Sequence, residues 1–248
     1  GSRAERFAAS RDLAEARVHV IPNGVADCSF RLRAFASHNF RIGIIGRITP
    51  EKGQVEFLQA AAILAPIFPH LQFVICGAPL FGGQHYERNL RQQAAGLPVE
   101  FLGWREDVNR VLAQLDLLVI ASSEEGLPRV LLEAFSAGVP VVAFPVGGIP
   151  EALEEESTGF LVQERSAEAL ARRLQALLNG DPARLREVAQ NARQLWERSY
   201  DVSRYQRAIT DLLAGLTPAS RAGMRTGAPP SRTPPPQSAE SENIPTDK

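Results

Sequence analysis

The chain has 248 residues, of which 44% are hydrophobic, and its formal net charge is -1 at pH 7. This length and apolar content are enough for one or two domains with a sizeable core. A net charge near zero gives no support for nucleic-acid binding or for general binding to anionic membranes. Two cysteines do not make a disulfide framework, and they favour a reducing compartment.

The first part of the chain, residues 1–39, is expected to be an N-terminal segment and connector. Residues 1–17 have a helical composition without a clean apolar face. A short apolar run at 18–21 is closed by Pro-Asn-Gly, which is typical of a turn, and residues 26–39 show little regular pattern.

From residue 40 onward, apolar runs alternate with helical patterns. The alternation predicts right-handed βαβ units and an α/β fold with a doubly wound parallel sheet, followed by C-terminal helices. We assign residues 40–216 to this Rossmann-like domain. The apolar runs are 42–46, 73–77, 99–103, 115–121, 139–144 and 159–162, and the helical patterns lie around 52–67, 84–95, 106–114, 128–137, 166–179, 183–198 and 202–215.

The last segment, residues 217–248, is rich in Pro, Ser, Gly and Thr and has almost no large apolar residues. Such a composition cannot bury enough surface to offset the entropy of ordering. The sequence therefore predicts a disordered tail.

Two carboxylates, Glu125 and Glu133, flank the predicted start of a helix directly after a buried strand. Pro128 suits the first helical position, where its missing N–H costs nothing. Glu125 then lies in the loop, and Glu133 lies just over one turn into the helix at about 1.5 Å rise per residue. Both acids can face one crevice at the positive end of the helix, which predicts a polar ligand site.

The spacing alone also fits a structural interpretation, in which Glu133 is solvated and Glu125 caps the helix. Two observations favour the ligand site. Glu133 interrupts an apolar series on a helix that is largely buried, and a buried carboxylate without donors is costly. Gly126 and the pair Gly147-Gly148 allow a close approach of the backbone.

A second charged group follows the first strand, in the segment GRITPEKG (46–53). Pro50 is expected to be the first helical residue, so that Lys52 lies in the first turn, where a cation opposes the helix dipole. Gly53 would cost about 0.8–1 kcal/mol relative to Ala inside that helix. Arg47, Lys52 and the helix N-terminus can form a phosphate site. Neutralisation by a neighbouring carboxylate and solvent is the alternative, and this segment alone leaves both open.

Ligands of doubly wound sheets bind outside the carboxyl ends of the strands, and both charged groups lie at such ends. Cations for a diphosphate beside acids for hydroxyl groups indicate a nucleotide joined to a sugar.

Several motifs occur in order along the chain: VHVIPNGV (18–25), GRITPEKG (46–53), GLPVEFLGWREDV (96–108) and S-EEGLP-VLLEA-SAGVPVVA, followed by GGIPE and TGFLV. Each is weak alone, but together the series resembles the C-terminal, donor-binding half of a retaining glycosyltransferase of the GT-B fold, family 4. The resemblance covers about residues 19–200, and Glu125 and Glu133 form its E-x7-E element.

The resemblance implies catalytic roles for three residues. Arg47 and Lys52 would hold the donor diphosphate and support the leaving group, and Glu125 would contact the transferred sugar. Glu133 would accept hydrogen bonds from the nucleotide ribose, and the segment from Leu102 to Arg105 would line the base pocket. The implied donor-binding residues are Gly46, Leu102, Trp104, Gly126, Leu127, Pro128, Arg129, Val130 and Glu133.

The resemblance also implies retention of configuration, no cofactor and no obligatory metal, with a nucleotide-diphosphate sugar as donor substrate. The acceptor, whether glycan, lipid or small molecule, is unknown. The acceptor-binding half of the fold would precede residue 18, so we expect this chain to need an N-terminal GT-B domain in cis or in trans.

Three other interpretations remain: a non-catalytic nucleotide-sugar-binding module, a GT-B sugar-nucleotide epimerase, and a dehydrogenase. The dehydrogenase ranks last because the third glycine of G-x-G-x-x-G is absent after Gly43 and Gly46. No apolar run is long enough to span a membrane. We expect a cytoplasmic location, and a peripheral position at the inner face of the membrane remains an alternative.

Overall fold

The computed structural model describes residues 19–35, 39–80 and 82–215. The helical composition noted at 1–17 and the tail expected at 217–248 lie outside the described residues. The chain divides into two compact units, Gly1–Ile209 and Thr210–Lys248, and the boundary between them falls inside the last helix. The first unit contains the sheet and the residues discussed below.

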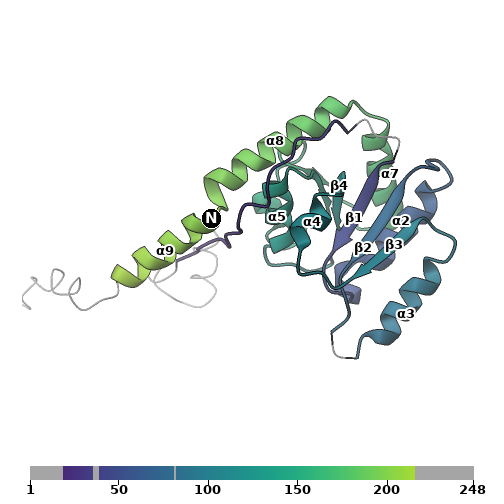
Figure 1. Cartoon of the computed structure of the whole chain (residues 1–248), viewed down its shortest axis with the longest axis horizontal. Coiled ribbons are helices and arrows are strands. Elements are labelled where there is room, and N and C mark those ends of the chain that lie inside the picture. Colours follow the sequence, from purple (N-terminus) through teal and green to yellow (C-terminus); the bar gives the residue numbers. More distant parts are fainter. Residues whose placement is uncertain (1–18, 36–38, 81, 216–248) are drawn as a thin grey trace, which may run out of the picture. The chain divides into compact units, whose positions relative to one another are not determined.

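Six strands form one sheet with parallel pairing throughout and the order β3-β2-β1-β4-β5-β6. Figure 1 shows β1 between β2 and β4. The doubly wound parallel sheet expected from the sequence is confirmed. Because β1 lies between β2 and β4, the chain reverses its direction of winding at β1, as in nucleotide-binding doubly wound folds. The strands are β1 (Arg41–Ile45), β2 (Gln72–Cys76), β3 (Val99–Gly103), β4 (Leu117–Ile120), β5 (Val141–Ala143) and β6 (Phe160–Leu161).

Helices connect the strands, as the alternating pattern predicts: α2 (Gln54–Leu64), α3 (Gln84–Gln93), α4 (Val108–Leu112), α5 (Arg129–Ala137) and α6 (Ile149–Ala152). Three more helices follow β6: α7 (Ala167–Leu178), α8 (Pro182–Ser199) and α9 (Val202–Gly215). The short α6 was not among the expected helices, because four residues are too few for a periodic pattern. Within the described ranges, no helix is both long and apolar enough to cross a membrane.

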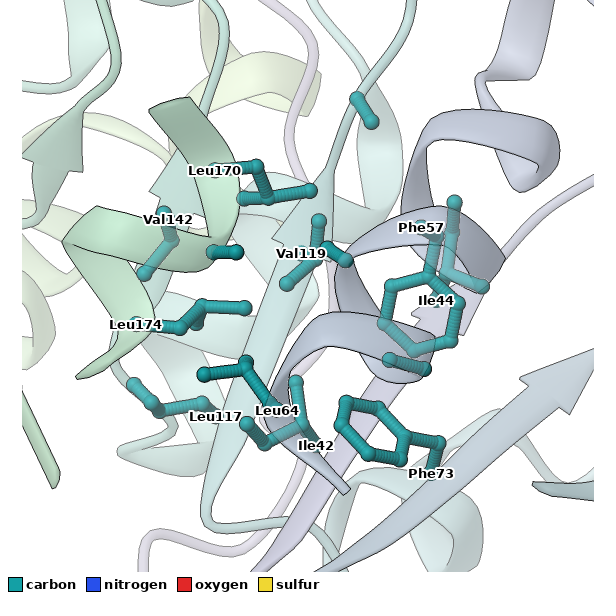
Figure 2. Packing of buried hydrophobic residues seen from close by; sticks show 14 of the residues in the cluster. Ile42, Ile44, Phe57, Leu64, Phe73, Leu117, Val119, Val142, Leu170 and Leu174 are labelled. Carbon is teal, nitrogen blue, oxygen red and sulfur yellow. The ribbon is translucent and has the colours of Figure 1, made fainter. Parts of the chain in front are cut away.

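One face of the sheet carries the first core, which α2 and α7 cover (Figure 2). Side chains alternate between faces along a strand, so Ile42 and Ile44 of β1 share this side. Phe73 of β2 meets Phe57 of α2 edge to face, with ring centroids 5.7 Å apart. The opposite face carries the second core, to which α4, α5 and α8 contribute.

The described part of the N-terminal segment packs against the second core. Val25 and Cys28 are buried there, and the backbone N–H of Cys28 donates to Oγ of Ser136 at 2.8 Å. The N–H of Val25 donates to the carbonyl of Tyr200 at 2.9 Å. Val25 is thus fastened to the end of α8, and Cys28 is fastened to α5.

The start of the first crossover differs from expectation. Pro50 begins a separate 3-10 turn, Pro50–Lys52, and α2 begins only at Gln54. Gly53 is therefore not inside a helix: it joins the two elements with a left-handed φ of 76°. A Cβ at Gly53 would lie 2.0 Å from the carbonyl oxygen of Ala121, so the close approach of α2 to the end of β4 requires glycine.

Candidate functional site

The candidate site lies where the loops after β1 and β4 leave the sheet. The two strands are neighbours, with Ile42 paired to Leu117 and Ile44 paired to Val119. Their carboxyl ends therefore open onto a shared edge, and the outward crevice at this edge is the usual ligand position in doubly wound sheets.

The loop after β1 is held close to the end of β2. The N–H of Gly46 donates to the carbonyl of Cys76 at 2.9 Å, and a Cβ at Gly77 would lie 1.8 Å from the carbonyl oxygen of Gly46. The side-chain amide of Gln54 donates to the carbonyl of Arg47 at 2.7 Å. These contacts fix the backbone that carries Arg47 and Lys52.

The loop after β4 carries Glu125, and α5 begins one residue later than Pro128. Pro128 takes the N-cap position with an extended ψ of 128°, rather than the first helical position. The expectation was therefore wrong by one residue, but Glu133 still lies just over one turn into α5.

Lys52 and Glu125 join the two loops. Nζ of Lys52 lies 2.5 Å from Oε1 of Glu125, and Oγ of Ser122 donates to the same oxygen at 2.7 Å. The side chain of Glu125 is only 9% exposed and that of Lys52 is 21% exposed. A carboxylate with so little solvent needs such donors, and these two supply them.

Glu133 is less well satisfied. Its nearest cation is Arg129 on the preceding turn of α5, at 3.8 Å, and the Arg129 side chain is 67% exposed. Burial raises the pKa of the Glu133 carboxyl, and the charge of Arg129 opposes this only in part. Glu133 is therefore a partly buried acid with unused hydrogen-bonding capacity.

The glycines after β5 hold the acidic loop in place. Gly147 has a left-handed φ of 57°, and a Cβ there would lie 1.7 Å from the carbonyl oxygen of Glu125. The N–H of Gly148 donates to the carbonyl of Gly126 at 2.5 Å. This is the close backbone approach that the glycine-rich loops predict.

One cavity of about 480 Å³ contains most of the predicted site residues. The basic and the acidic residues line this one cavity, as the sequence predicts. Among the predicted residues, Gly46, Arg47, Lys52, Trp104, Glu125, Leu127, Pro128, Arg129, Val130 and Glu133 line it.

Two predicted residues lie elsewhere. Leu102 is partly buried against the second core and is not among the residues that line this cavity. Gly126 lines an adjoining polar cavity of about 590 Å³, which shares Arg47, Lys52 and Glu125 with the first. Trp104, by contrast, is 66% exposed at the cavity rim, so it is not a core residue.

Three residues that the sequence did not single out also belong to this region. Cys76 and Gly77 line the cavity because β2 ends beside β1. Arg105, the last residue of the segment expected to line the base pocket, lines the cavity next to Trp104. Ser122 is buried and holds Glu125. Its position immediately after an apolar strand is the one feature of the sequence that could have identified it.

A cavity of about 380 Å³ lies at the opposite edge of the sheet, where Phe40 and Leu71 precede β1 and β2. Its walls are mainly apolar and include Phe68 and Leu185. Its lining includes none of the predicted site residues.

The strand order and the charged cavity at the winding reversal define a Rossmann-like, ligand-binding α/β domain. The sequence also matches a protein-family model: residues 31–195 match the model of the glycosyl transferases group 1 family. The chain belongs to this family, and its domain corresponds to the C-terminal half of the GT-B fold.

Relatives of known function are similar over the same region. The D-inositol 3-phosphate glycosyltransferase of Corynebacterium urealyticum is 34% identical over 170 residues, which are 64% of this chain and 40% of that protein. The Escherichia coli UDP-Gal:alpha-D-GlcNAc-diphosphoundecaprenol alpha-1,3-galactosyltransferase is 28% identical over 165 residues, 59% of this chain and 41% of that protein. The chain thus spans about two fifths of the length of these curated relatives.

Solved structures resemble the domain closely. Anabaena Alr3699/HepE in complex with UDP and glucose is 28% identical with a TM-score of 0.75, over 86% of this chain and 61% of that chain. The C-terminal domain of the glycosyl transferase group 1 family protein LpcC from Francisella tularensis is 26% identical with a TM-score of 0.60. That match covers 72% of this chain and 100% of that one.

Proposed function

We propose that this domain binds a nucleotide-diphosphate sugar and serves as the donor half of a retaining, family 4 glycosyltransferase. The observation that carries the proposal is the single cavity of about 480 Å³ that Arg47, Lys52, Glu125 and Glu133 line together. The complex of HepE with UDP and glucose supports a uridine nucleotide as the first candidate donor.

The charges suit the leaving group. Cleavage of a glycosyl phosphate places negative charge on the diphosphate, which Arg47, Lys52 and the N-terminus of α5 would stabilise. Lys52 donates to Glu125 in the free protein, and an ammonium group has three donors, so it can hold Glu125 and a phosphate oxygen together.

The acids suit the sugar and the ribose. Positive charge develops on the sugar ring as the bond breaks, and the carboxylate of Glu125 would stabilise it. Glu133 has unused acceptor capacity on the same cavity wall and would accept hydrogen bonds from the ribose hydroxyls.

Transfer would need an acceptor-binding N-terminal domain in cis or in trans. The share of the curated relatives that this chain covers, about two fifths, supports such an arrangement. We also propose that the reaction needs no cofactor and no obligatory metal, because the basic residues and the helix terminus would neutralise the diphosphate. Donor binding that is unchanged by a chelator agrees with this, and loss of binding contradicts it.

A thermal-shift panel of UDP, GDP, ADP and their sugars tests donor binding. A ligand at about 100 times its Kd stabilises the folded state by about 2.7 kcal/mol, so the preferred base raises Tm most. No shift with any nucleotide would contradict the proposal.

A second experiment separates an enzyme from a binding module. The chain is combined with the N-terminal half of a family member, and NMR follows the anomeric proton of the product. Retained configuration is the expected result. Donor binding without transfer identifies a binding module, and an altered sugar formed without acceptor identifies an epimerase.

A further inference from the structure

A cavity of about 20 Å³ borders the Lys52–Glu125 pair and is distinct from the larger donor cavity. Four polar residues contribute to its walls: Lys52, Gln54, Ser122 and Glu125. The remaining walls are apolar and come from Ile44, Ile45, Val119, Ile120 and Val130. A space of roughly 10–15 Å³ is enough for one water molecule when two to four polar groups surround it.

Gln54 places a buried, unpaired acceptor oxygen at this small cavity. It is 1% exposed, and its Nε2 donates to the carbonyl of Arg47 at 2.7 Å. That bond fixes the amide orientation, because the flipped amide would bring two acceptor oxygens together. Its Oε1 is buried and finds no hydrogen-bond donor among the described residues. An unmet buried acceptor is costly, so Oε1 requires a donor from another source.

We infer that one buried water molecule occupies this cavity and links Gln54 to the Lys52–Glu125 pair. The water donates one hydrogen to Oε1 of Gln54 and the other to the carboxylate of Glu125, and it accepts from Nζ of Lys52. Each of these groups lines the cavity, and the link satisfies the acceptor that the protein leaves unpaired.

Gln54 and Ser122 then act as positioning residues. Ser122 is 2% exposed and holds Oε1 of Glu125 directly, whereas Gln54 holds the pair through the water. Together they fix a lysine and a carboxylate before a ligand arrives, which reduces the cost of ordering them on binding. This consequence rests on the proposed function, since the ligand is the nucleotide diphosphate.

A crystal structure of the full chain and of its Gln54→Leu variant tests the water site directly. Leucine is close in size and carries no polar side-chain atom. The wild-type map should show an ordered water in contact with residue 54, Lys52 and Glu125, and the variant map should lack it. A wild-type map that resolves other buried waters but none here would overturn the inference.

Calorimetric titration with UDP tests the positioning role. Gln54→Leu and Ser122→Ala should each weaken UDP binding about 3- to 10-fold, the scale of one net hydrogen bond. Ser122→Thr keeps the hydroxyl and should bind as the wild type does. Ser136→Ala is the matched control: this buried serine on α5 bonds Cys28, so its loss should lower Tm without changing affinity.

Unchanged UDP affinity in both Gln54→Leu and Ser122→Ala would overturn the positioning role. Failure of the wild-type chain to bind UDP, GDP or ADP would instead contradict the proposed function. The crystallographic comparison decides the water site in either case.

Discussion

Nζ of Lys52 and Oε1 of Glu125 lie 2.5 Å apart, although the two residues are 73 positions apart in the chain. They meet because β1 and β4 pair in the sheet, so the loops that follow them share one edge. The contact joins the basic and the acidic halves of the cavity. It also uses only part of the donor capacity of the lysine, which leaves hydrogen bonds for a ligand.

Lys52→Ala should weaken UDP binding about 10- to 150-fold, because a hydrogen bond to a charged group contributes about 1.5–3 kcal/mol. Calorimetry measures the affinity, and circular dichroism verifies that the variant is folded. Arg110→Ala is the control, since that arginine side chain is 84% exposed on α4. Equal UDP affinity in the Lys52 variant and the wild type would remove Lys52 from the site.

Glu133→Gln should raise Tm of the free protein at neutral pH. Burial raises the pKa of Glu133 in the folded state above its usual value of 4.5, so the folded state binds this proton more tightly than the unfolded state does. The contribution of this group to stability is therefore largest at low pH and falls as pH rises through the folded-state pKa.

Thermal unfolding at several pH values between acidic and neutral tests the direction of this pH dependence. The wild type should lose part of its stability across the window, and Glu133→Gln should lose less. The same variant should bind UDP more weakly, because it exchanges a carboxylate acceptor for an amide. If Glu133→Gln loses as much stability between acidic and neutral pH as the wild type does, the raised pKa of Glu133 does not contribute to the pH dependence.

Gly147→Ala should destabilise the domain strongly. The substitution places a methyl group against the carbonyl of Glu125 and requires a left-handed φ that alanine disfavours. Gly126→Ala is the matched comparison, because a Cβ there meets nothing within 4 Å. Denaturant unfolding should show a clear loss for Gly147→Ala and little change for Gly126→Ala. Similar losses in both variants would mean that the Gly147 contact does not hold the loop.

Trp104→Ala should distinguish base recognition from diphosphate recognition. Stacking of a base on an aromatic ring contributes about 1–3 kcal/mol, and Trp104 is exposed at the cavity rim. UDP binding should weaken, whereas pyrophosphate binding and Tm should not change. Equal losses for both ligands would assign Trp104 a role other than stacking.

The sequence predicted the sheet and most helices because both depend on local patterns. Runs such as 73–77 are apolar enough to identify buried strands, and the helical pattern at 128–137 corresponds to α5. The first crossover was predicted less well. Thr49 and Pro50 are typical of a helix start, but tertiary contact of Gly53 with Ala121 splits the segment into a turn and a helix.

The charged residues of the site could be predicted from their places after the strands, whereas their partners could not. Ser122 and Gln54 gain their importance from contacts across the fold, with Glu125 and with the backbone of Arg47. Leu102 packs against the second core, and a short strand at the edge of the sheet gives no reliable sign in the sequence of which face a side chain takes.

An NMR titration of the labelled chain with UDP shows at which edge of the sheet the nucleotide binds. Binding at the edge shared by β1 and β4 predicts that the amide resonances of Gly46, Gly126 and Val130 move together and saturate. Shifts confined to the opposite edge, around Phe40 and Leu71, or no shifts at all, would contradict a nucleotide site at this cavity.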